Sequence, residues 1–317
     1  MRALWPWLRL LAGLGILVAL GWRLGTGAFL DGLRSITLTS VLAALAIGLL
    51  TTLASAGRWQ LVARGLGLPL TLGKAVADYY RGLLLNAVLP AGVLGDVHRA
   101  VSHGRESGDL GRGVRAVVFE RFAGQVVLIA VGLAVLLTGT MPALDLVPSP
   151  GVLGLVLAGA AVALVLVLRR VPAVRRELAA TLTDARQLLA SGSLLKVAVL
   201  SAVALGGHVL LFVVAARAAG ATASLGVLAP VFVLALLVMA LPVNVGGFGP
   251  REAFLAVAFG AAGLGAAQGL TTGVVYGVLA LIAALPGALV LWSPAKHREG
   301  VRERVDQPRQ QLGALAS

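Results

Sequence analysis

Long stretches without a charged residue are the feature that most limits how this chain can fold. Four stretches of 20–23 residues, each suited to one crossing, contain no Asp, Glu, Lys or Arg: residues 35–57, 122–144, 146–168 and 197–216. A helix needs about 20 apolar residues to cross the hydrocarbon core of a bilayer. Charged residues make up only 12% of the chain, whereas a soluble domain carries roughly 25%. The sequence therefore predicts an all-α, polytopic membrane protein.

Two further crossings are expected near the ends of the chain. Residues 4–22 are mostly apolar and carry tryptophans that suit the membrane interfaces. A cleaved signal peptide is the alternative there, but no small-x-small cleavage site follows the apolar run. Residues 218–295 contain only two charged residues, Arg251 and Glu252, so this segment must hold more than one membrane element. About six full crossings are predicted in one membrane domain, residues 1–295.

The distribution of basic residues predicts the orientation. If the N-terminus is inside, twenty Lys and Arg residues fall on the inside, and three fall outside, namely Arg23, Arg34 and Arg217. Basic residues are retained on the cytoplasmic side of a membrane. Both termini are therefore expected in the cytoplasm, with the chain in the cell membrane and residues 296–317 as a basic, disordered tail.

The same charges limit the partners and cofactors. The net charge is +13, but the basic residues lie at the ends of apolar runs rather than in one solvated domain. This pattern favours anionic or phosphate-bearing membrane lipids over nucleic acid. The chain has no cysteine, which excludes thiol catalysis and cysteine-held metals. The histidines lack metal-ligand spacing and no Walker lysine occurs, so neither a metal nor a cofactor is expected.

Residues 75–100 are predicted to form a re-entrant hairpin. Both flanks, Lys74 and Arg99, are basic and are assigned to the inside, yet two full crossings would need about 40 residues. Two short helices that enter and return fit this length, with breaks at Pro90 and Gly92. Irregular backbone at that depth requires a protein-lined or hydrated cavity.

A second hairpin is predicted over residues 225–264 because the first break is repeated. The pattern Leu-Pro-x4-Gly-x3-Arg occurs twice, ending at Arg99 and at Arg251. Three crossings separate the copies, so the second hairpin enters from the outside and the repeat is inverted, as in many transporters. The alternative is an ordinary inside loop between two full spans. The predicted hairpin breaks are Pro90, Gly92, Gly95, Pro242, Gly246, Gly247 and Gly249.

Charged residues within the apolar segments are the candidate site residues, because they are expensive there and usually pair or line a pathway. Asp96 and Arg99 share a helix face and are expected to pair. For Arg99, Glu120 and Arg121 a capping or snorkelling role is an equal alternative. Arginine binds phosphate through paired donors. The candidates are Arg81, Asn86, Asp96, Arg99, Glu120, Arg121, Arg251 and Glu252, and Arg81 and Arg251 are favoured because apolar sequence flanks both.

Residues 172–196 are predicted to form an amphipathic helix on the cytoplasmic membrane surface. Val174, Leu178, Leu182 and Leu189 fall on one stripe, with Arg176 and Glu177 opposite.

These residues resemble a known family, the flippase-like membrane domain related to the transmembrane part of lysylphosphatidylglycerol synthase. The resemblance covers about residues 40–292, and it rests on residues 57–59, 86–100, 120–124 and 241–253. It adds Arg58 and Asn244 to the candidate substrate-binding residues. It implies movement of a modified or phosphate-bearing lipid between leaflets without ATP-binding machinery. The soluble aminoacyl-transferase domain of the synthase has no counterpart here, so the chain is not expected to make the lipid.

Three functions follow as hypotheses. The first is a lipid flippase whose midplane cavity, lined by Arg and Asp/Glu, carries a phosphate-bearing or aminoacylated lipid; it is a transporter rather than an enzyme. The second is a membrane-embedded transferase on a lipid phosphate, with Asp96 or Glu120 as base. The third is a membrane partner for a separate soluble lipid-modifying enzyme, docked near residues 169–196. The 41 glycines would also allow a homodimer.

The orientation can be tested with single cysteines, because the chain has none of its own. A cysteine replacing Ser149 should react with a membrane-impermeant maleimide added outside, and one replacing Ser191 only after the inside face is exposed. The reverse pattern would overturn the orientation.

Overall fold

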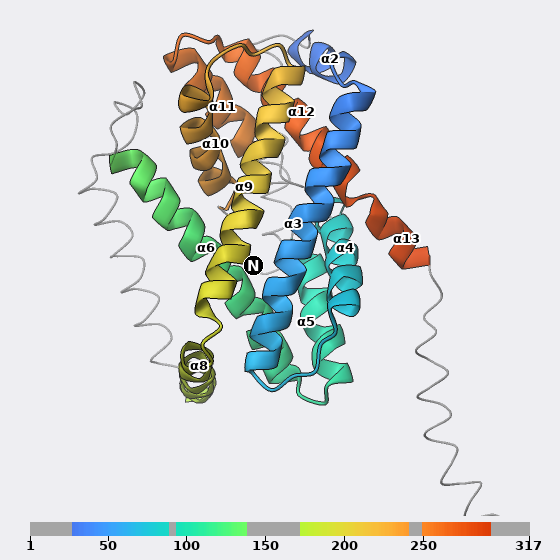
Figure 1. Cartoon of the computed structure of the whole chain (residues 1–317), viewed down its shortest axis with the longest axis vertical. Coiled ribbons are helices and arrows are strands. Elements are labelled where there is room, and N and C mark those ends of the chain that lie inside the picture. Colours follow the sequence, from blue (N-terminus) through green and yellow to red (C-terminus); the bar gives the residue numbers. More distant parts are fainter. Residues whose placement is uncertain (1–26, 89–92, 138–171, 241–248, 293–317) are drawn as a thin grey trace, which may run out of the picture.

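A computed structural model describes residues 27–88, 93–137, 172–240 and 249–292, and within these ranges the regular structure is entirely helical (Figure 1). This confirms the all-α class. The helices are α2 (Gly27–Arg34), α3 (Leu38–Gly65), α4 (Leu72–Val88), α5 (Leu94–Glu106), α6 (Leu110–Leu137), α8 (Pro172–Ala190), α9 (Leu194–Ala218), α10 (Leu225–Met239), α11 (Pro250–Ala261), α12 (Ala266–Ala284) and α13 (Pro286–Trp292).

Among the described residues, four helical segments are long and apolar enough to cross a membrane: α3, α6, α9 and Ala266–Val290, which joins α12 to α13. They correspond to four of the six predicted crossings. The other two, residues 4–22 and 146–168, lie outside the described residues, as does the tail, residues 296–317.

The helix α3 begins and ends later than its charge-free stretch. It begins after Thr37, whose hydroxyl accepts a hydrogen bond from the Ser40 backbone at 3.3 Å, while Ser40 Oγ accepts from the Thr37 backbone at 3.0 Å. Reciprocal bonds of this kind satisfy free donors in the first turn of a helix. The helix continues through Arg58 to Gly65, so Arg58 lies within the helix rather than in an inside loop.

The helix α6 begins at Leu110, twelve residues before the predicted start. Gly113, Ala116, Val117 and Glu120 recur at helical spacing and form its buried face, and α6 packs against α5 through this region. Packing therefore extends the helix past the charges that ended the apolar stretch. Glu120 and Arg121 therefore lie in the interior of α6 rather than just before the crossing predicted at residues 122–144.

The helices α4 and α5 form an antiparallel hairpin. Lys74 Nζ near the start of α4 lies 2.7 Å from Glu106 Oε2 at the end of α5, so both ends of the pair lie together. Burial alone would lower the pKa of Lys74, but Glu106 and Asp78 outweigh it and raise that pKa. The second helix of the hairpin ends at Glu106, beyond the predicted limit of residue 100, while the predicted breaks at Pro90 and Gly92 lie outside the described residues.

The helices α10 and α11 form the second pair, within the predicted range 225–264. The Gln268 amide at the start of α12 donates a hydrogen bond to the Ala219 carbonyl just after α9. The chain therefore enters and leaves the α10–α11 pair at the same end of the bundle. Gly249 has φ of 109°, which favours glycine, and Pro250 follows in the first turn of α11, where proline is tolerated. Pro242, Asn244, Gly246 and Gly247 lie outside the described residues.

The two helix pairs lie toward opposite ends of the bundle. In Figure 1, α4 and α5 lie toward the end that carries α8, whereas α10 and α11 lie toward the end that carries α2. Between them, α3 and α9 pack along much of their length. Each pair therefore lies beside one end of the central helices.

The amphipathic helix predicted over residues 172–196 is shorter than expected. α8 ends at Ala190 because Gly192, with φ of 65°, reverses the chain, and Lys196 belongs to α9. Asp184 on α8 is buried and accepts from Arg115 on α6 at 2.6 Å. Leu182 and Leu189 of the predicted apolar stripe are exposed, as a helix lying on a membrane surface requires.

The close contact between α4 and α5 gives a stability prediction. A Cβ added at Gly95 would overlap the Gly82 backbone, whereas one at Gly73 on α4 meets nothing within 4 Å. Gly95→Ala should therefore lower the free energy of unfolding in detergent by about 1–3 kcal/mol, and Gly73→Ala should change it by less than about 0.5 kcal/mol. Equal stability of the two variants would contradict this packing.

Candidate functional site

Glu120 on α6 is the centre of a buried charge network that joins its helix to three others. Its side chain is fully buried, and its Oε1 accepts from Arg58 Nε on α3 at 3.0 Å and from the Tyr79 hydroxyl on α4 at 3.3 Å. Arg58 Nη2 also donates to Oε1. On the other side, Glu120 Oε2 accepts from Arg99 Nη2 on α5 at 3.2 Å. A buried carboxylate is tolerated only when its oxygens are paired in this way.

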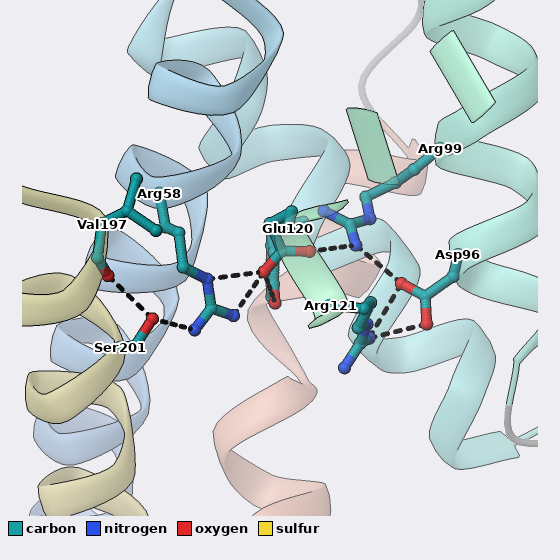
Figure 2. Close-up of polar contacts among 8 residues, drawn as sticks. Arg58, Asp96, Arg99, Glu120, Arg121, Val197 and Ser201 are labelled. Atoms are coloured by element: carbon teal, nitrogen blue, oxygen red, sulfur yellow. Dashed lines mark hydrogen bonds and ion pairs between the residues drawn. The ribbon is translucent and has the colours of Figure 1, made fainter. Parts of the chain in front are cut away.

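Arg58 is held on both sides. Its Nη1 donates to Ser201 Oγ on α9 at 3.0 Å, and Ser201 in turn donates to the Val197 carbonyl at 2.8 Å (Figure 2). Gly124, one turn after Glu120 on α6, leaves room for the guanidinium, because a Cβ there would lie 2.8 Å from Arg58 Nη1. The network therefore ties α3, α6 and α9 together.

Arg99 is the second buried arginine of the network. Its guanidinium carbon lies 4.2 Å from the ring centroid of Tyr79 and 4.7 Å from that of Trp59, distances at which aromatic faces attract a cation. Its Nη2 donates to Asp96 Oδ1 at 2.7 Å, which confirms the predicted i, i+3 pair. Arg99 Nη1 is buried without a hydrogen-bond partner among the described residues.

Asp96 and Arg121 form the accessible edge of the network. Arg121 Nη2 lies 2.6 Å from Asp96 Oδ2, and the Arg121 side chain is 44% exposed. Asn86 on α4 donates to the same Asp96 oxygen at 3.3 Å and accepts from the Gly95 backbone at 2.7 Å. Asn86 thus fixes the start of α5 and the orientation of Asp96. The dashed lines in Figure 2 follow the successive contacts, which run from Ser201 to Arg58, Glu120, Arg99, Asp96 and finally Arg121.

The charges of the network do not cancel. Within the part of the chain that the structure describes, Arg58, Arg99 and Arg121 face two carboxylates, Glu120 and Asp96. The network therefore carries one surplus positive charge. Arg121 is the arginine that a ligand can reach, because Arg58 and Arg99 are buried. This arrangement can accept one anion through a planar, permanently charged donor group.

The network lies nearer one end of the crossing helices than the centre. Arg58 lies seven residues before the end of α3 and Ser201 seven residues after the start of α9, about 10 Å at 1.5 Å per residue. Glu120 lies ten residues after the start of α6, about 15 Å. This end is the one predicted to be cytoplasmic.

A second charged cluster contains the predicted residues Arg251 and Glu252. Both are buried at the start of α11. Glu252 Oε1 accepts from Arg251 Nε at 2.9 Å, and Glu252 Oε2 accepts from the Gly249 backbone at 2.6 Å. The guanidinium of Arg251 lies 5.1 Å from the Tyr276 ring centroid on α12. The carboxylate thus caps α11 and neutralises the neighbouring arginine.

The structure brings together six of the predicted candidates in the first network: Arg58, Asn86, Asp96, Arg99, Glu120 and Arg121. Arg251 and Glu252 form the separate second cluster. Arg81 instead pairs with Asp78 on its own helix at 2.6 Å, and Asn244 lies outside the described residues. Of the two favoured arginines, Arg251 is buried, whereas the Arg81 side chain is 25% exposed.

Three residues of the first network were not predicted: Tyr79, Trp59 and Ser201. Ser201 had a signal in the sequence, since it interrupts the apolar stretch 197–216 together with His208. Tyr79 and Trp59 had none by themselves, because an aromatic residue in a membrane helix is usually a packing or interface residue.

The helices and the buried charges define a multi-pass membrane protein. Over residues 7–287 the chain matches the family described as the lysylphosphatidylglycerol synthase TM region, and it belongs to that family. This confirms the resemblance inferred from the motifs and associates the chain with membrane lipids. No curated protein and no solved structure matches it.

The central place of Glu120 gives a second stability prediction. Glu120→Gln leaves Arg58 and Arg99 buried without their shared counter-charge and should lower the free energy of unfolding in detergent by about 3–5 kcal/mol. The matched control is Glu106→Gln: Glu106 pairs with Lys74 and is 46% exposed, so its loss should cost about 0–1 kcal/mol. Similar losses in the two variants would contradict the central role of Glu120.

Proposed function

We propose that the protein is a lipid flippase that moves a phosphate-bearing lipid between the two leaflets. The observation that carries the proposal is the surplus positive charge of the first network, with Arg121 accessible at its edge. A phosphate headgroup would bind the Arg121 guanidinium and take the place of Asp96 as its partner. The family membership, which concerns membrane lipids, supports the same class of substrate.

Energetics supports a polar ligand at this place. An arginine near the bilayer centre costs roughly 2.5–3.5 kcal/mol on insertion scales. Arg121 lies eleven residues inside α6, about 16 Å from its start, and its side chain is 44% exposed. An arginine exposed at that depth would be stabilised by binding an anionic lipid headgroup. The lipid would move with this headgroup along the protein surface while its acyl chains stay in the bilayer.

The two helix pairs supply the access that a flippase needs. We interpret α4–α5 and α10–α11 as re-entrant hairpins from opposite sides, the first from the cytoplasm and the second from outside. Their positions at opposite ends of the bundle (Figure 1) and their returning ends support this interpretation. Each hairpin carries its own arginine, Arg99 or Arg251, so each leaflet has a charged cluster within reach.

A transfer reaction with Glu120 as base is less well supported. Glu120 accepts hydrogen bonds from Arg58, Arg99 and Tyr79, and a carboxylate stabilised by this many donors is a weak proton acceptor. Asp96 is likewise engaged by two arginines. We therefore propose a transporter rather than an enzyme, located in the cell membrane with both termini in the cytoplasm.

The proposal is tested by reconstitution into liposomes that contain fluorescent phosphatidylglycerol, whose outer-leaflet fraction is quenched by dithionite. The wild-type protein should equilibrate the label between leaflets, and Arg121→Ala should slow this at least tenfold, since a charge-assisted hydrogen bond contributes roughly 1.5–3 kcal/mol. Labelled phosphatidylcholine, which has no net charge, should move more slowly, and labelled lysyl-phosphatidylglycerol tests an aminoacylated headgroup.

The matched control is Arg112→Ala on the same helix. Arg112 is 45% exposed and lies 3.7 Å from Asp109, outside the network, so this variant should transport like wild type. Transport by Arg121→Ala at the wild-type rate would remove the assigned site, and a wild-type protein that moves no tested lipid would refute the flippase.

A further inference from the structure

The two arginine clusters are connected by one pair of side chains that neither cluster contains. His208 on α9 and Tyr276 on α12 place Nδ1 and the hydroxyl oxygen 3.4 Å apart. Tyr276 is buried and its ring lies beneath Arg251 of the second cluster. His208 is half-buried, and on α9 it lies seven residues after Ser201, which binds Arg58 of the first cluster. The pair therefore contacts the second cluster through Tyr276 and lies on the same helix as a residue that binds the first.

The geometry of α9 fixes the spacing of this connection. Ser201, which binds Arg58, and His208 are seven residues apart on α9. Seven residues are about two helical turns, so both side chains lie on one face about 10 Å apart. His208 lies ten residues before the end of α9, and Tyr276 ten residues after the start of α12, each about 15 Å from the end opposite the first cluster. The pair thus occupies the middle of the bundle.

The chemistry of the pair suits an anionic group in transit. A neutral imidazole and a phenol have one donated hydrogen each; one of the two joins the pair, and the other can be donated to a phosphate oxygen without either group carrying a charge. A polar residue in the interior of a membrane helix usually marks a pathway. His208 and Ser201 are the two side chains with hydrogen-bonding groups in the otherwise apolar stretch 197–216; Ser201 binds Arg58 of the first cluster, and His208 lies beside Tyr276.

We infer that His208 and Tyr276 form an intermediate binding station for the phosphate headgroup, between the Arg58–Arg99–Arg121 network and the Arg251–Glu252 cluster. This inference rests on the proposed function and adds the path between its two ends. A headgroup that leaves Arg121 would be received by His208 before it reaches Arg251, so the path between the two clusters is divided into shorter steps, each of which ends at a hydrogen-bond donor.

Two variants separate this station from the first binding site. His208→Ala should slow the translocation of phosphatidylglycerol about tenfold, and Tyr276→Phe, which removes one oxygen, should slow it severalfold. Binding of phosphatidylglycerol to the detergent-solubilised protein, measured by native mass spectrometry, should change by less than about twofold in both, because Arg121 is intact. Arg121→Ala should lose both binding and transport. Val203→Ala, at an exposed apolar position on α9, is the control and should lose neither.

A chemical measurement keeps the test independent of transport and of the alanine variant. In His208→Cys the introduced thiol is the only one in the chain. It should react faster with a negatively charged methanethiosulfonate than with a positively charged one, and phosphatidylglycerol should slow both reactions. Leu210→Cys on the exposed side of α9 should show neither effect.

The outcomes distinguish the two proposals. Wild-type transport rates in His208→Ala and Tyr276→Phe, or a His208→Cys thiol without charge preference or lipid protection, would overturn the station and leave the flippase standing. Failure of the wild-type protein to translocate phosphatidylglycerol would refute the flippase and the station together.

Discussion

The pairing of Glu120 with Arg58 and Arg99 is the interaction on which the rest of the site depends. The three residues come from α6, α3 and α5, and all are buried. Two buried cations that share one carboxylate must keep it in place, because removal of a buried counter-charge is costly. Every helix that carries one of these residues is therefore fixed relative to the others. The positions of Asp96 and Arg121 follow from this arrangement of helices, and so does the side of the bundle on which the surplus charge lies.

Glycines make this frame possible. Gly124 gives Arg58 the space to reach Glu120, and the contact of Gly82 with Gly95 lets α4 and α5 approach closely enough for Tyr79 to lie against Arg99. Small residues commonly permit such approaches between membrane helices, where apolar side chains gain little by leaving lipid. At these positions glycine has two effects. It lets helices pack closely, and it leaves space for long side chains to reach one another.

The sequence predicted those features that depend on residues close together in the chain. It yielded the crossing helices, because a bilayer requires long apolar runs, and the Asp96–Arg99 pair, because i, i+3 residues share a helix face. It did not yield the bond between Arg58 and Glu120, which are 62 residues apart, and Arg58 entered only through the family resemblance. Helix ends were misplaced where charges were taken as boundaries: α6 continues across Arg112, Arg115 and Glu120 since partners or exposure satisfy each of them. Arg81 is the opposite case. It was predicted to be a site residue, but it pairs with Asp78 on its own helix, and nothing in the sequence separates a local pair of this kind from a binding site.

The fixed anchoring of the arginines has a consequence for how voltage acts on the proposed transport. Because Glu120 and Tyr79 hold Arg99 between packed helices, the positive charges stay with the protein and only the charge of the lipid moves. Each anionic headgroup that crosses would then carry one elementary charge through the membrane field, about 2.3 kcal/mol for every 100 mV. A potential that is negative inside would drive such a lipid outward without any nucleotide, so the direction of net movement would be set by the membrane in which the protein sits.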